Sequence, residues 1–167
     1  MSTDFLHELV LASVRASMLF FTLGLVLPGA ARRWPFADPQ RLGVWLFGLF
    51  ALAHLAHYAL VAWFRVAIRQ IPAGKQAAVL LTVGSVFYAA ALAALLGRIK
   101  ARRAGGGRRD RLETAGVVVV WLFFMIAYVG RYILGSPWNA LVLVWLCVSL
   151  SFYARSQPKR AAAASAD

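Results

Sequence analysis

Acidic residues and cysteine are scarce in this chain of 167 residues, which has six Asp plus Glu and one Cys. A single cysteine excludes an intrachain disulfide framework, and no Cys/His cluster has the spacing of a zinc site. No carboxylate lies deep in an apolar run, so neither a carboxylate proton relay nor an acidic ion site is supported. Phosphate-binding loops, nucleophile elbows and Cys-x-x-Cys motifs are also lacking.

Apolar residues, in contrast, make up 62% of the chain, where an ordinary soluble domain has roughly 45 to 50%. They gather in runs that match the roughly 20 helical residues needed to cross a bilayer, or come close to it. The runs cover residues 9–31, 42–64, 77–97, 114–134 and 138–154. They are apolar on all sides and do not alternate with a period of two, which favours helices over transmembrane strands.

The sequence therefore predicts an all-α integral membrane bundle of about five transmembrane helices. No long linker or internal repeat divides the chain, so we expect a single five-helix domain over residues 1–156. The alanine-rich residues 157–167 have too little apolar pattern to dock and are predicted to be a disordered tail.

Basic residues are distributed unevenly between the two sides of such a bundle. Of the 18 Lys plus Arg, 13 lie in segments 32–41 and 98–113 and in the C-terminal tail, and four lie on the other side. The positive-inside rule then predicts a bacterial-type inner membrane protein with its N-terminus outside and its C-terminus cytoplasmic. Residues 98–111 lack interleaved aromatic rings, so a topology determinant beside lipid headgroups is favoured over a nucleic-acid partner.

Two histidines lie in the second apolar run. The helical rise of about 1.5 Å per residue puts His54 almost at the bilayer midplane, with His57 less than one turn away on the same face. An ionisable group at that depth needs a partner. Two interpretations are open: a site in which one imidazole binds a metal or haem iron, or neutral imidazoles that hydrogen-bond to a neighbouring helix.

A resemblance to a known family is carried by three stretches of the first two apolar runs. These are Ser13-Val-Arg15-Ala-Ser-Met-Leu-Phe-Phe-Thr-Leu-Gly-Leu-Val-Leu-Pro28-Gly-Ala-Ala-Arg32-Arg33, Arg41-Leu-Gly43 and Ala-Leu-Ala-His54-Leu-Ala-His57-Tyr58. In the order of its segments the chain resembles the ferric-reductase-like transmembrane domain over about residues 9–134. It is most similar there to the haem-binding membrane subunit of the bacterial methionine sulfoxide reductase system.

That resemblance implies a helical protein that moves electrons across the membrane through haem b held by histidine pairs on two helices. His54 falls where the family has a haem-ligating histidine, but the positions of its partner histidines are occupied by other residues, Ile126 and Ala67 among them. Met125 or Met18 could complete a His/Met pair, although methionine in an apolar run is also ordinary core packing. A second protomer could instead offer its own His54 across a homodimer axis.

The leading prediction is a membrane-embedded haem-associated electron-transfer or redox accessory subunit. In it His54 is the metal ligand, His57 or Arg15 supports the cofactor, and quinone or a redox partner protein supplies electrons. The alternative is a non-catalytic membrane scaffold, or a small-ligand (quinone or lipid) binding protein that has lost the haem sites. The sequence leaves open whether the chain is an enzyme.

Three further patterns are read as structural. Glu113 is predicted at a helix N-terminus, where negative charge is favourable. Tryptophans at the ends of the runs are predicted to anchor the membrane interface; they are Trp34, Trp63 and Trp138. Small residues at every fourth position of the third run predict close helix packing; they are Ser85, Ala89, Ala93 and Gly97.

Overall fold

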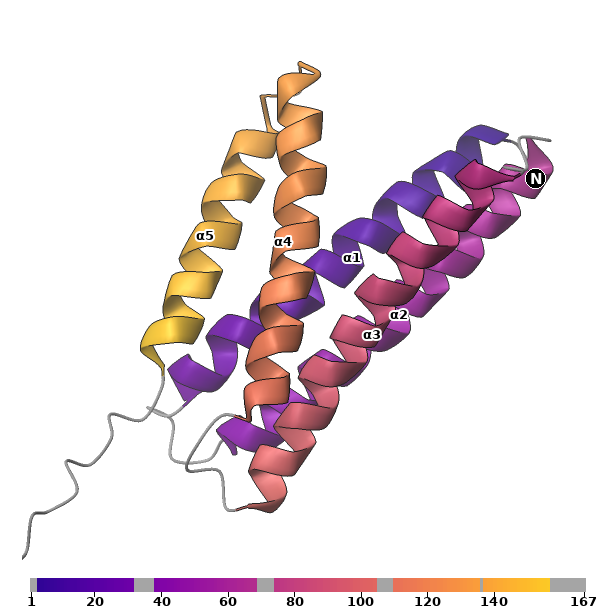
Figure 1. Cartoon of the computed structure of the whole chain (residues 1–167). Coiled ribbons are helices and arrows are strands. Elements are labelled where there is room, and N and C mark those ends of the chain that lie inside the picture. Colours follow the sequence, from indigo (N-terminus) through magenta and orange to yellow (C-terminus); the bar gives the residue numbers. More distant parts are fainter. Residues whose placement is uncertain (1–2, 32–37, 69–73, 105–109, 136, 157–167) are drawn as a thin grey trace, which may run out of the picture.

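The computed structural model describes residues 3–31, 38–68, 74–104, 110–135 and 137–156, and their regular elements are all helical (Figure 1). The helices are α1 (Thr3–Ala30), α2 (Pro39–Ala67), α3 (Lys75–Arg103), α4 (Arg111–Ile133) and α5 (Asn139–Arg155). Each predicted run corresponds to one helix, which confirms the all-α prediction. The largest differences are that α1 already begins at Thr3 and that α3 continues to Arg103. Trp34 and the predicted disordered tail lie outside the described residues.

Four of these helices, α1 to α4, are long and apolar enough to cross a membrane. The fifth, α5, is apolar but has 17 residues, which span about 25 Å against a hydrocarbon core of about 30 Å. The chain is thus an α-helical membrane protein. The exposed Trp63 and Trp138 lie at helix ends, as the interface prediction requires.

Aspartates fix the starts of two helices. Asp38 accepts hydrogen bonds from the backbone N–H groups of Gln40 and Arg41, at 2.9 and 3.0 Å. Pro39 follows it at the first helical position, where its fixed φ and missing N–H cost nothing. Asp110 caps α4 in the same way through the N–H of Leu112, at 2.8 Å. These caps satisfy donors that the first turn of a helix leaves unpaired.

The helices form two groups, α1 to α3 and the pair α4 and α5. Figure 1 shows the groups together where α1 ends and spreading apart toward the end where α1 begins. We term these the closed end, which holds Ala30, Pro39, Arg103, Arg111 and Arg155, and the open end, which holds Thr3, Ala67, Lys75, Ile133 and Asn139. Most of the Lys and Arg residues that the structure describes lie toward the closed end.

Glycines bring the backbones of α3 and α4 together near the closed end. A Cβ atom at Gly97 would overlap the backbone of Glu113, and one at Gly116 would overlap the backbone of Ala90 and Ala94. The predicted small-residue stripe was therefore only partly right, because Ser85 and Ala89 are exposed. The packed face of α3 instead runs through Ala90, Ala94 and Gly97, since the real contact follows both i+3 and i+4 steps.

An aromatic cluster fills the space where α1 to α4 meet. Its rings lie edge-on or tilted to one another with centroids 5.2 to 6.5 Å apart, the range in which aromatic pairs are attractive. We term this the aromatic core, and its members are Phe21, Phe47, Phe50, Phe87 and Phe124. On the open-end side of this core lies His54.

Candidate functional site

Two serine-histidine pairs join α1 to α2. The hydroxyl of Ser17 lies 3.0 Å from Nδ1 of His54, and that of Ser13 lies 2.9 Å from Nδ1 of His57. The helices are antiparallel, so serines four residues apart on α1 face histidines three residues apart on α2. We term these four residues the serine-histidine ladder. Both imidazoles thus have the hydroxyl partner on a neighbouring helix that one interpretation of the sequence expects.

The hydrogen bonds also define which ring nitrogen of His57 is a donor and which is an acceptor. Ser13 donates its only hydroxyl hydrogen to the carbonyl of Val10, at 2.8 Å. Nδ1 of His57 must therefore be the donor in its bond to Ser13. In the neutral imidazole, Nε2 is then left as a hydrogen-bond acceptor. His57 is half-buried, so this acceptor belongs to a side chain that a ligand can approach.

His54 is more deeply enclosed, with 5% of the residue exposed. Its ring stacks on Phe87 with centroids 4.0 Å apart, and Tyr58 lies edge-on at 4.9 Å. Nε2 of His54 is buried and has no hydrogen-bond partner among the described residues. Leaving a buried polar atom unpaired costs about 1 to 3 kcal/mol of stability. Nε2 of His54 is therefore the atom of this site that most clearly lacks a hydrogen-bond partner.

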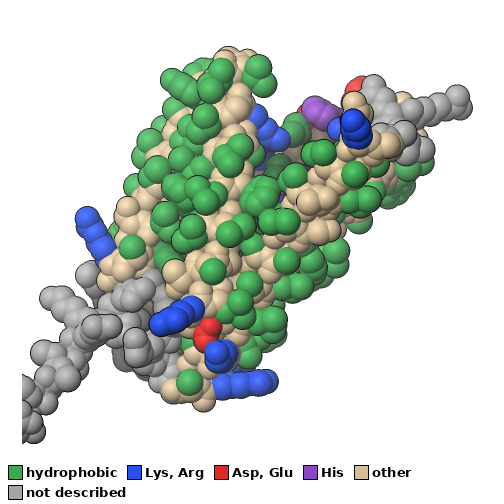
Figure 2. All heavy atoms as spheres, viewed as in Figure 1, with side chains coloured by type: hydrophobic (Ala, Val, Ile, Leu, Met, Phe, Trp, Pro, Cys, Tyr) green, Lys and Arg blue, Asp and Glu red, His purple; other side chains and the backbone are tan. Residues whose placement is uncertain are grey.

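The ladder lies beside a recess between the two helix groups. Figure 2 shows the open end hollowed, with Lys or Arg and His side chains at its border. Tyr128 of α4 is 4% exposed, and the Arg131 guanidinium lies 5.5 Å from the centroid of its ring. Arg15 of α1 and His57 of α2 each lie in the half of their helix nearer the open end. Arg15, His57, Tyr128 and Arg131 are thus brought to one region from three helices.

The other sequence candidates are placed elsewhere. Met125 and Met18 are partly buried hydrophobic residues that pack against the aromatic core, which is the packing role that the sequence left open for them. His7 is exposed on α1 and contacts Phe64, with ring centroids 6.0 Å apart. It takes no part in the ladder.

A haem can be tested against this packing. An axial imidazole presents one nitrogen to iron at about 2.0 Å, at the centre of a flat porphyrin. Because Ser17 occupies Nδ1 of His54, iron would need Nε2, which protein atoms enclose and whose ring Phe87 covers. Both ladder histidines turn Nδ1 toward α1, so their rings lie side by side, 5.7 Å apart, and do not face each other across one iron. The residues as packed do not fit a haem.

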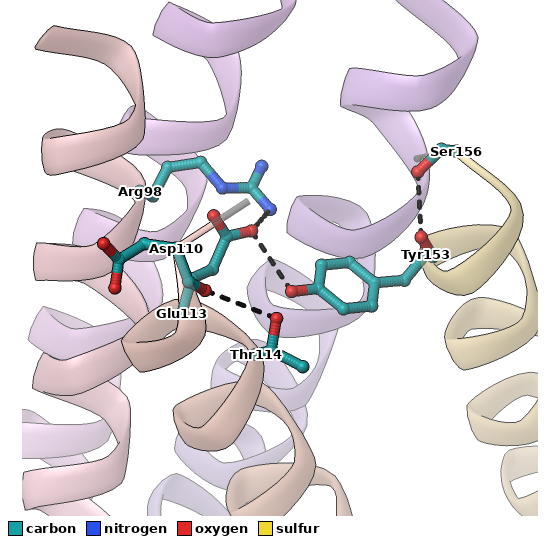
Figure 3. Close-up of polar contacts among 6 residues, drawn as sticks. All are labelled: Arg98, Asp110, Glu113, Thr114, Tyr153 and Ser156. Atoms are coloured by element: carbon teal, nitrogen blue, oxygen red, sulfur yellow. Dashed lines mark hydrogen bonds and ion pairs between the residues drawn. The ribbon is translucent and has the colours of Figure 1, made fainter. Parts of the chain in front are cut away.

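A buried ion pair at the closed end was not predicted. Figure 3 shows Arg98 of α3 and Tyr153 of α5 both directed at Glu113 of α4; Arg98 Nη2 lies 2.5 Å and the Tyr153 hydroxyl 3.3 Å from Glu113 Oε1. The Arg98 and Glu113 side chains are 6% and 2% exposed. Arg98 also lies 4.8 Å over the ring of Phe47, and a Cβ at Gly43 would overlap its guanidinium.

This ion pair corrects two interpretations of the sequence. Arg98 had been grouped with the solvated basic segment 98–111, and Glu113 had been read only as a charge at a helix start. Glu113 does lie in the first turn of α4, but its carboxylate is buried against the partner helix. The available signal was a pair of opposite charges flanking the α3 to α4 connection, each next to an apolar run.

Comparisons of the chain with models of protein families, with curated proteins and with solved structures give no match. Within the described residues, no group of three or more His, Cys, Asp or Glu is placed to hold a metal ion.

Proposed function

We propose that this protein is a membrane-embedded binding protein for a lipid-soluble small ligand with hydrogen-bonding oxygens, of the quinone or lipid class. The observation that carries the proposal is the serine-histidine ladder. It places two imidazoles inside the apolar bundle, gives Nδ1 of each a serine partner, and leaves Nε2 of His54 without a partner among the described residues. Such groups are costly in a membrane, which makes them functional by default.

The position of the serine-histidine ladder, like its chemistry, supports the binding of a small ligand. Phe87, on which His54 stacks, also contacts Phe123 and Phe124 of α4. Farther toward the open end, α4 is largely uncovered: Tyr132 is 49% and Ile133 is 75% exposed. The ladder therefore lies where the helix groups begin to separate. A ligand that enters the recess reaches the half-buried His57, while His54 is enclosed behind it.

The distribution of basic residues predicts the membrane leaflet from which a ligand would enter the recess. With the basic closed end in the cytoplasm, as the positive-inside rule requires, the N-terminus is outside and the recess opens in the outer half of a bacterial-type inner membrane. A lipid-soluble ligand then enters sideways from the outer leaflet. A reporter fused after Asp167 is expected to be cytoplasmic, and a periplasmic signal would reverse this assignment.

Calorimetric titration of the purified protein in detergent with decylubiquinol and decylubiquinone tests the proposal. We expect saturable binding of the quinol, because the neutral His57 offers an acceptor to a hydroxyl group. His57→Ala should weaken binding about tenfold, the loss of roughly one hydrogen bond. His7→Ala is the matched control, since it removes an imidazole outside the ladder. No saturable binding of either probe, or an equal loss in His7→Ala, would refute the proposal.

A haem-associated electron-transfer subunit is the second candidate; it requires the helices around His54 to open, because the residues as packed do not fit a haem. Nδ1 of His54 is held by Ser17 while Nε2 has no partner among the described residues, which is how a metal-ligating imidazole is usually oriented. The ligand on the opposite face would have to come from a second protomer or from a rearranged α4. The absorption spectrum of the purified protein decides: a Soret band abolished in His54→Ala supports haem, and a colourless folded protein excludes it from the isolated chain.

A further inference from the structure

We infer that the recess binds the oxyanion group of an acidic amphiphile, a phosphate or carboxylate on an apolar chain, between Arg15 and Arg131. This inference rests on the proposed ligand-binding function and names the class of ligand more closely. Neither arginine takes part in the ion pairs of the closed end. Each lies on a different helix group, so a ligand held by both would bridge the recess.

The balance of charge is the first argument. Three of the acidic side chains in the described residues pair with basic residues of the closed end: Glu113 with Arg98, Asp110 with Lys100, and Asp38 with Arg102. The other two, Asp4 and Glu8, lie in the opening turns of α1. Within the described part of the chain, neither Arg15 nor Arg131 has a carboxylate within ion-pair distance. Among the described residues, these two guanidinium groups therefore have no protein counter-charge.

Depth is the second argument. Arg15 lies about 18 Å along the axis from the first residue of α1, near the middle of that helix, and its side chain is exposed. Arg131 lies in the last turn of α4 and is also exposed. Both arginines lie on the open-end side of the contact between Phe21 of α1 and Phe124 of α4, whose ring centroids are 5.6 Å apart. One cation thus lies at the rim of the recess and the other deeper, where a guanidinium without an anion is costly.

The chemistry of the two groups and of their surroundings selects the ligand. A guanidinium group offers a planar set of donors that matches phosphate and carboxylate oxygens. Apolar side chains border the hollow in Figure 2, which is the environment for an acyl chain. A neutral quinone uses the imidazoles but leaves both arginines unpaired. An acidic amphiphile supplies both arginines with the counter-charge that a neutral quinone lacks.

The test compares probes that share a dodecyl chain: dodecyl phosphate, dodecanoate and dodecanol, titrated into the full-length protein in a nonionic detergent. We expect both acids to bind about tenfold more tightly than the alcohol. Arg15→Gln and Arg131→Gln should each remove most of that preference. Arg65→Gln is the matched control, since it removes a charge at the same end of the molecule on α2 and should leave the preference unchanged. Equal binding of acid and alcohol by the wild type would overturn the inference.

The source of the oxyanion is resolved in nanodiscs that contain phosphatidylglycerol and phosphatidylcholine. Retention of phosphatidylglycerol through detergent extraction, measured by native mass spectrometry and lost in Arg15→Gln, supports a lipid headgroup. Binding of the dodecyl acids without such retention supports a free acid. If decylubiquinol binds through His57 but the acid preference is missing, the inference fails while the proposed function stands. If the preference is present but His57→Ala changes nothing, the ladder fails as the ligand site while the arginine pair stands.

Discussion

The two ends of the bundle use polar residues in opposite ways. At the closed end, Arg98 and Glu113 are of opposite sign and neutralise each other inside the protein. At the open end, Arg15 and Arg131 are of one sign, exposed, and without a carboxylate partner among the described residues. The buried charges of the closed end are thus paired within the chain, whereas these two exposed charges of the open end are not.

Helix α4 contains both environments and so provides an internal comparison. Gly116, near the closed end, touches the backbone of α3 so closely that no Cβ atom fits, whereas Gly130, near the open end, has no other atom within 4 Å of an added Cβ. One helix is thus tightly packed near the closed end and uncovered only along its last five residues, 129–133. The recess therefore arises from where α4 contacts α3, and not from the residue composition of α4.

The largest expected effect is on the buried ion pair. Glu113→Gln leaves the Arg98 guanidinium buried without its counter-charge, which should lower the free energy of unfolding by about 3 to 5 kcal/mol. The double variant Arg98→Met with Glu113→Leu should recover most of that loss. Thermal unfolding in detergent, followed by circular dichroism, measures both. Lys100→Met is the exposed control and should cost no more than about 1 kcal/mol; a similar loss in all three variants would remove the distinction between buried and exposed pairs.

The next largest effect on the free energy of unfolding is expected from substitution of Gly116, compared with Gly130 on the same helix. Gly116→Ala should destabilise by about 1 to 3 kcal/mol, because the new methyl group overlaps the backbone of α3. Gly130→Ala should be neutral or stabilise by about 0.5 to 1 kcal/mol, since alanine has less conformational freedom to lose in a helix. The same unfolding measurement compares them. Destabilisation by Gly130→Ala would mean that the open end is covered by protein.

A smaller loss in the free energy of unfolding is expected when either serine of the serine-histidine ladder is replaced. Ser17→Ala removes the partner of the buried His54 and should cost about 1 to 2 kcal/mol. Ser13→Ala should cost less, because His57 is half-buried and has other access to hydrogen-bonding groups. Equal losses in the two variants would contradict the enclosure of His54 that the structure describes.

The smallest effect concerns pH at the closed end. A hydrogen bond from Lys100, with a further one from the Leu112 N–H, holds the pKa of Asp110 below its ordinary range. Because the folded-state pKa lies below the unfolded one, the contribution of the carboxylate is present above the unfolded value and is lost as pH falls through the folded value. The unfolding temperatures of wild type and Asp110→Asn should therefore differ by a constant amount from neutral pH down to about 4. Their difference should vanish only at lower pH.

The five helices could be predicted from the sequence, because each contains an apolar run whose length is typical of a membrane span or a buried helix. Sequence reasoning also reached His54 and His57, because imidazoles stand out within an apolar run. It missed the roles of Ser13 and Ser17, whose partners are 44 and 37 residues away along the chain. It also grouped Arg98 with solvated charges, because hydrophobic runs show where a helix lies in the membrane but not which face meets a neighbour.

The sequence alone determined the membrane class, the number of apolar helices and the side on which positive charge accumulates. Those properties depend on the transfer of side chains between water and hydrocarbon, which is nearly additive along a chain. Only the tertiary structure decided that Arg98 is neutralised while Arg15 is not, that one nitrogen of each ladder histidine is fixed, and that α4 leaves a recess beside them. Those properties depend on the distance between atoms of different helices, and in a membrane that distance is set by local packing and hydrogen bonding.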